Sequence, residues 1–143
     1  MKTNSLYIVC LGIFLIACKS QQYTAETLPA NQLAFGEGGG FSGAITEFIL
    51  LENGQLFEKN SLTNKVEELP PVKKKRVQAL RTEAKALNMS NLNINSPGNI
   101  YYFIRYQQAD TIQQAIWGDP NYTLDPKVQN LYQRLKAFTI KTK

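Results

Sequence analysis

The sequence predicts an α+β domain: an antiparallel sheet of about four to five strands from two hairpins, each followed by a helix, with both helices packed on one face. Two observations support this prediction. Apolar, β-branched runs flank an Asn-Gly turn at residues 53–54, which is typical of a hairpin. Helical spacing of apolar residues follows Pro70-Pro71 and again follows Asp125-Pro126. The second half of the chain therefore repeats the order of the first half.

The expected elements follow from hydrophobic periodicity. Strands are predicted at 32–35, 44–51, 55–59, 65–69, 100–107 and 112–117. Helices are predicted at 72–87 and from Pro126 to the end, with Asp125 as the N-cap of the second helix. In the first helix, Val77, Leu80, Ala84 and Leu87 form the apolar stripe, and the basic residues, including Arg81, are expected to project away from it. Residues 88–99 are rich in turn formers and are predicted as a loop.

The beginning of the chain indicates export. Met1 and Lys2 precede a nearly unbroken apolar run over residues 6–17, which is typical of a secretory signal peptide. This run is too short for a spanning helix, which needs about 20 apolar residues. We expect a signal peptide at 1–17, a lipidated N-terminus and flexible tether at 18–31, and a single α+β domain at 32–143.

The end of the apolar run, Leu-Ile-Ala-Cys18, resembles the lipobox of bacterial lipoproteins. This resemblance implies that Cys18 is acylated and becomes the first residue of the mature chain, so that membrane lipid is its first partner. Lys19 follows Cys18, as in lipoproteins passed on to an outer membrane, and no acidic residue occurs at 19–22. We therefore expect an outer-membrane, periplasm-facing protein. The alternative is a soluble secreted protein with a chance cysteine.

Residue types exclude most catalytic chemistry. The chain contains no histidine, and Cys10 would leave with the signal peptide, so neither an internal disulfide nor a His/Cys metal site is expected. Ser42 lies in Gly-Phe-Ser-Gly-Ala, where the second glycine comes one place early for a hydrolase elbow, and it has no histidine base. We expect no catalytic residue, no metal and no cofactor. The net charge is +5, or +4 once Lys2 leaves with the signal peptide; this surplus favours anionic partners only weakly, and the compartment argues against nucleic acid.

The glycine-rich stretch at 36–43 is the feature around which the chain is organised. Because it leads into a strand rather than a helix, it does not match a phosphate-binding loop. Its predicted role is to hold a backbone conformation that other residues could hardly adopt. An exposed Phe41 could insert into a cleft, or Phe41 could fold onto the sheet as a core plug, which is the favoured interpretation. The binding candidates here are Gly38, Gly39, Gly40, Phe41, Ser42 and Gly43.

Two further segments carry candidate binding residues. Trp117, Asp119 and Tyr122 lie in or beside one loop, where aromatic side chains suit protein recognition, although Trp117 could equally belong to the core. The basic run at 73–76 could contact anionic lipid, but a solvated helix face is the favoured interpretation.

The order of motifs resembles the emfourin family, small bacterial proteins related to inhibitors of thermolysin-like metallopeptidases. The resemblance covers about residues 35–138. It rests on Gly39, Gly40, Phe41 and Gly43, and more loosely on Leu69-Pro70 and Gly118-Asp119. It implies a non-catalytic protein-binding module whose partner is a peptidase. The alternative is a structural or assembly accessory of a membrane complex, without inhibitory activity.

Overall fold

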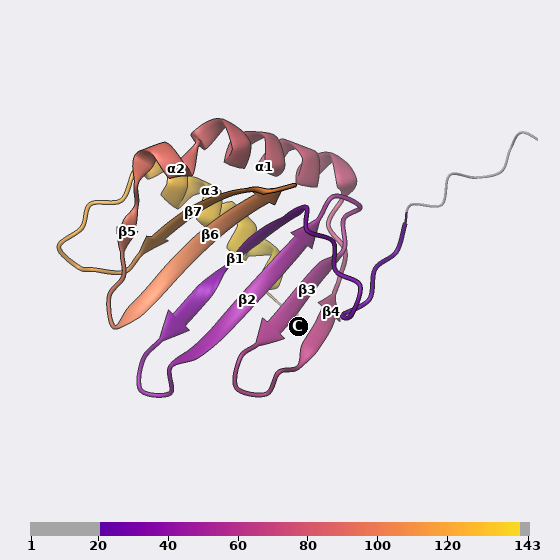
Figure 1. The fold of residues 1–143 in the computed structure, drawn as a ribbon, viewed down its shortest axis with the longest axis horizontal. Helices are drawn as coiled ribbons and strands as arrows, with labels where there is room; N and C mark the ends of the chain where they lie inside the picture. Colours follow the sequence, from indigo (N-terminus) through magenta and orange to yellow (C-terminus); the bar gives the residue numbers. More distant parts are fainter. Residues whose placement is uncertain (1–20, 141–143) are drawn as a thin grey trace, which may run out of the picture.

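Both halves of the chain contribute strands to one seven-stranded sheet in the computed structural model, which describes residues 21–140 (Figure 1). The strands are β1 (Gln32–Gly39), β2 (Ala44–Leu51), β3 (Leu56–Asn60), β4 (Val66–Leu69), β5 (Asn95–Ser96), β6 (Ile100–Gln108) and β7 (Thr111–Trp117). Their order across the sheet is β4-β3-β2-β1-β6-β7-β5. The predicted signal peptide and Cys18 lie outside the described residues.

The α+β class is confirmed, but the prediction of about four to five antiparallel strands is wrong. The sheet is larger because all six candidate strands belong to it and because β5 adds a seventh; β1 is also longer than predicted and extends to Gly39. The sheet is also mixed, since β5 pairs with β7 in parallel while all other neighbouring strands are antiparallel.

The helices cover one face of this sheet, as predicted (Figure 1). They are α1 (Lys74–Leu87), α2 (Met89–Leu92) and α3 (Pro126–Lys136), with a 3-10 turn at Ala137–Thr139. The main core lies between sheet and helices; it contains Leu33, Phe35, Ile104, Val77, Leu80, Leu131 and Leu135, among others. Each fully buried side chain of this kind contributes roughly 1.5–3 kcal/mol, so the helices are held mainly by this core.

Local capping explains where α3 begins. The Asp125 side chain accepts a hydrogen bond from the Lys127 amide at 2.8 Å, and Pro126 occupies the first turn, as the sequence predicts. The loop predicted at 88–99 instead contains α2 and β5. Asn88 and Asn93 adopt positive φ angles of 45° and 47°, so the chain turns at both ends of the short α2 helix.

The N-terminal segment is packed onto the sheet face that the helices leave open. Tyr23 and Leu28 cover a small second core of Ala34, Ile49, Leu51 and Phe57. The Tyr23 amide donates to Gln55 Oε1 at 2.8 Å, and Gln55 Nε2 donates to the Tyr23 carbonyl at 3.0 Å. Residues 21–31, predicted as part of a flexible tether, are therefore in contact with the domain. Gln55 supplies a backbone-like pairing partner that the sequence pattern did not indicate.

The hairpin predicted at Asn53-Gly54 is present, but its turn is not the type I′ turn that Asn-Gly favours. Only Gly54 has a positive φ, of 101°, whereas a type I′ turn requires two such residues. The Gly54 amide donates to the Leu51 carbonyl, and the Leu51 amide donates to the Gln55 carbonyl. The loop between the strands spans residues 52–55, one residue more than the predicted 52–54. Within residues 21–140, no helix combines the length and the apolar character needed to cross a bilayer.

Candidate functional site

The turn between β1 and β2 holds Phe41 in water. Gly39, Gly40 and Gly43 have φ angles of 95°, 70° and 62°, and the Gly43 amide donates to the Gly40 carbonyl at 3.2 Å. The Ser42 hydroxyl accepts from the Ala44 amide at 3.3 Å. The Phe41 side chain is fully exposed. The core-plug interpretation of Phe41 is therefore wrong, because the turn directs its side chain away from the sheet.

This turn is fixed to the neighbouring strand by close backbone contact. The Gly40 amide donates to the Asn99 carbonyl at 2.8 Å, just before β6 begins. A Cβ atom on Gly39 would lie 2.1 Å from that same carbonyl oxygen. A Cβ atom on Gly38 would lie 2.6 Å from the Tyr101 hydroxyl oxygen, because the Tyr101 ring lies over this glycine. Gly38 and Gly39 thus serve close approach, whereas Gly40 and Gly43, with open space around them, serve the turn.

Three other loops reach the same end of the sheet as the turn at 40–43, and we call this end the glycine end. These loops are residues 61–65, 97–99 and 118–125. The Ser61 amide donates to the Ile45 carbonyl at 2.9 Å, and the Asp119 amide donates to the Ser96 carbonyl at 3.0 Å. Hydrogen bonds therefore link these loops to adjacent strands. In Figure 1 the β1–β2 and β3–β4 turns lie side by side at the lower edge of the view. Four exposed large apolar side chains belong to this end: Phe41, Leu62, Ile100 and Tyr122.

The residues nominated near Trp117 have different environments. The Trp117 ring packs against Tyr132 at 5.1 Å and Tyr102 at 6.1 Å between ring centroids, so it is part of the core beneath α3. Asp119 accepts from the Asn121 amide at 2.8 Å and shapes its own loop. Tyr122 is 37 % exposed. The structure therefore brings Tyr122 to the same end of the sheet as Phe41 but does not offer the Trp117 ring as a free binding group.

Tyr132 connects α3 to β1 behind the glycine end. Its hydroxyl donates to the Gly36 carbonyl at 3.3 Å. Burial raises the pKa of the Tyr132 phenol, and the negative charge of Glu37 and the neighbouring Tyr102 raise it further. Tyr132 is consequently a neutral structural donor rather than an acid-base group at physiological pH.

A cavity of about 590 Å³ opens at the opposite end of the sheet, which we call the arginine end. Its lining comes from the N-terminal segment, the β2–β3 turn, the end of β6 and one side of α1. The lining residues are Gln21, Tyr23, Pro29, Asn31, Glu52, Asn53, Lys74, Gln78, Arg81, Thr82, Lys85, Tyr106 and Gln108. Most of these side chains are polar, so the cavity suits a hydrophilic ligand better than an apolar one.

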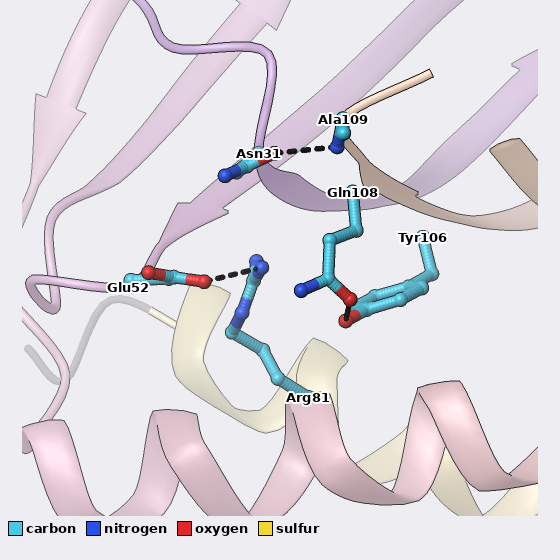
Figure 2. Close-up of polar contacts among 6 residues, drawn as sticks. All are labelled: Asn31, Glu52, Arg81, Tyr106, Gln108 and Ala109. Atoms are coloured by element: carbon cyan, nitrogen blue, oxygen red, sulfur yellow. Dashed lines mark hydrogen bonds and ion pairs between the residues drawn. The ribbon is translucent and has the colours of Figure 1, made fainter. Parts of the chain in front are cut away.

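Arg81 is the unusual residue of this cavity, because only 6 % of it is exposed. Its Nη2 atom donates to Glu52 Oε1 at 2.8 Å, and its guanidinium carbon lies 5.3 Å from the centre of the Tyr106 ring. Figure 2 shows the side chain extending from α1 between Glu52 on one side and Tyr106 with Gln108 on the other. The Nη1 atom is buried and has no hydrogen-bond partner.

The surrounding wall is ordered by its own hydrogen bonds. The Tyr106 hydroxyl donates to Gln108 Oε1 at 2.8 Å, and the Ala109 amide donates to Asn31 Oδ1 at 2.7 Å (Figure 2). Ala109 has a φ of 48°, so the β6–β7 turn is held in a conformation that alanine rarely adopts. The wall therefore keeps a defined shape around the guanidinium group.

Sequence reasoning missed the arginine end. Arg81 was predicted to project away from the apolar stripe of the first helix. It lies four residues after Val77 and three before Ala84, which places it on the buried face of α1. A charged residue at the helical spacing of the apolar stripe could have indicated a buried arginine. In the basic run, Lys74 lines the cavity, and the Arg76 guanidinium lies 6.0 Å from the Phe138 ring.

No protein-family model and no curated protein matches this chain. The lipobox and emfourin resemblances therefore remain predictions that rest on their motifs. In the described part of the chain, no three His, Cys, Asp or Glu side chains converge as metal ligands.

Proposed function

We propose that this chain is a non-catalytic protein-binding module, held at the outer membrane through acylated Cys18, that presents the glycine end to a protein partner. The observation that carries the proposal is the complete exposure of Phe41 at the tip of a short turn. A phenylalanine surrounded by water adds nothing to the core. Large aromatic side chains are frequent anchors of protein interfaces because they bury much area on binding.

The conformation of the turn supports this role. Its three positive-φ glycines and the hydrogen bonds at Gly40, Gly43 and Ala44 fix the backbone before any partner arrives. A loop that is already ordered loses less conformational entropy on binding than a flexible one. Leu62 and Tyr122 add exposed apolar surface at the same end of the sheet.

The position of Gln21, where the described part of the chain begins, supports an orientation relative to the membrane. The Gln21 carbonyl accepts a hydrogen bond from Asn53 Nδ2 at 2.7 Å, at the arginine end. Cys18 precedes Gln21 by three residues, a distance of at most about 10 Å along an extended chain. Strand β1 has eight residues and spans about 26 Å toward the glycine end. An acylated Cys18 would therefore place the arginine end near the bilayer and Phe41 away from it.

The emfourin resemblance names the partner class to test, a thermolysin-like metallopeptidase. We expect the full chain to inhibit such an enzyme and the Phe41→Ala variant to bind about 30-fold more weakly or worse, as for an interface hot spot. Ile112→Ala is the matched control, because Ile112 is 54 % exposed but lies in the strand that follows the turn at the other end. Absence of inhibition at micromolar protein would remove the peptidase from the proposal and leave the accessory role.

The anchor has a separate test. A Cys18→Ser variant should lose metabolic labelling by fatty acid and should leave the membrane fraction, because the thiol is the acylation site. The Cys10→Ser variant is the control and should keep both properties. Lipid labelling that persists in Cys18→Ser would overturn the anchoring part of the proposal.

A further inference from the structure

Arg81 and the cavity beside it point to a second binding site, at the opposite end from Phe41. We propose that this cavity binds a phosphate monoester group, supplied either by a soluble phosphate ester or by a lipid whose head group is a phosphate monoester, as in phosphatidic acid. The inference does not depend on the proposed function, because it rests only on residues of the arginine end.

The first argument is the incomplete pairing of a buried charge. A buried guanidinium group is costly unless its N–H groups find acceptors. Glu52 satisfies Nη2, but 61 % of the Glu52 side chain is exposed, and Nη1 has no acceptor within the described chain. An apolar residue at position 81 would continue the stripe of Val77 and Ala84 without this cost. The arginine is thus explained by a ligand better than by packing.

The second argument is the charge of the lining. Lys74, Arg81 and Lys85 carry positive charge, and Glu52 is the one acidic side chain among the lining residues. Neither lysine forms an ion pair within residues 21–140. The lining therefore has a net charge of +2, which a phosphate monoester balances because it carries nearly two negative charges at neutral pH. The guanidinium fork also matches the spacing of phosphate oxygens.

The third argument is the placement of cations on α1. Lys74 is the first residue of this helix, and the first turn contains no acidic residue. Cations at this position oppose the helix dipole, which is positive at the N-terminus. An anion bound beside Lys74 would relieve that repulsion. Uncharged donors complete the lining, including Gln78 and Thr82.

The test is calorimetric titration of the full chain, in a non-ionic detergent at neutral pH, with inorganic phosphate and with glycerol 3-phosphate. We expect saturable binding that sodium acetate at equal ionic strength does not reproduce. The Lys74→Gln/Lys85→Gln variant should bind about tenfold more weakly or worse, since two charge-assisted contacts are lost. Lys73→Gln/Lys75→Gln is the matched control. It changes the net charge equally, but neither residue lines the cavity.

An Arg81→Met variant tests the guanidinium itself and should abolish phosphate binding while its circular dichroism spectrum stays that of the wild type. If that variant does not fold, the lysine pair still decides the question. Equal losses of affinity in the two double-lysine variants would show only general attraction by positive charge and would overturn the proposal. Absence of saturable binding of every phosphate probe would also overturn it.

Vesicles distinguish the two sources of the phosphate group. If the natural ligand is a lipid, more of the chain should float with phosphatidic acid vesicles than with phosphatidylcholine vesicles, which report the contribution of acylated Cys18 alone, and free phosphate should compete for the excess. That excess flotation should be lost in Lys74→Gln/Lys85→Gln and retained in the control pair. If the ligand is soluble, calorimetric binding remains but flotation is equal in both pairs. Both patterns support the cavity as a phosphate site.

Discussion

The glycine end and the arginine end differ in how their unusual residues relate to the fold. At the glycine end an apolar side chain, Phe41, is fully exposed, although the backbone beneath it is tightly fixed. At the arginine end a charged side chain, Arg81, is buried with one nitrogen unpaired. Each end inverts the usual distribution of apolar and charged groups. The comparison predicts that exposure at one end costs the fold little, whereas burial at the other end lowers its stability.

Among the residues of the two ends, the largest effect on stability is expected from Gly39→Ala at the glycine end. This change should lower the free energy of unfolding by about 3 kcal/mol, because it adds a Cβ atom against a backbone carbonyl at a strained φ. Gly40→Ala is the control: its φ is also positive, but no atom lies within 4 Å of the added Cβ. Its loss should be about 1 kcal/mol. Equal losses in urea unfolding would contradict the close approach at Gly39.

Arg81→Met should act in the opposite direction. It should raise the free energy of unfolding by about 2 kcal/mol, because it replaces an incompletely paired buried charge with an apolar side chain of similar length. Glu52 remains solvated after this change. Arg134→Met, which breaks the more exposed pair with Glu83, should change stability by less than about 0.5 kcal/mol. A loss of stability in Arg81→Met would show that the arginine end is built for stability.

Alkaline pH should weaken the contact behind the glycine end. The pKa of Tyr132 is raised in the folded state, so above about pH 10 the unfolded chain releases the phenol proton while the folded chain keeps it. The contribution of Tyr132 is therefore fully present below that pH and is lost as the pH rises toward the folded pKa, by about 1.4 kcal/mol per pH unit. Urea unfolding of Tyr132→Phe at a series of pH values should lack this slope.

The smallest effect on stability is expected from Phe41→Ala. Because the side chain contacts water, its removal should change the free energy of unfolding by less than about 0.5 kcal/mol. Phe35→Ala, in the core beneath the helices, should cost about 4 kcal/mol. A large loss in Phe41→Ala would mean that the exposed position is not the one the folded chain occupies in solution.

Local sequence signals predicted much of the fold. The strand at 44–51 was predicted to the residue, because its β-branched run ends in a turn signal. The start of α3 was predicted from Asp125-Pro126 for the same reason, since a cap depends only on neighbouring residues. The glycine turn was located in this way too. The direction of the Phe41 side chain was not predicted, because it depends on the φ angles of Gly39, Gly40 and Gly43 together.

The features that were missed depend on distant partners. Strand β5 has two residues and exists only through parallel pairing with β7. The docking of Tyr23 depends on Gln55, which is 32 residues away in the sequence. The Arg81 cavity is lined by side chains from the N-terminal segment, β6, α1 and the β2–β3 turn, so no single segment of the sequence predicts it.

The strand order has a consequence for how copies of this chain behave when they are crowded. The outermost strands are β4, with four residues, and β5, with two. β4 also carries two consecutive glutamates, Glu67 and Glu68. Long, uncharged edge strands can pair with strands of other molecules, whereas short edge strands with acidic side chains pair poorly. Molecules held side by side on a surface should thus stay separate instead of joining into fibrils.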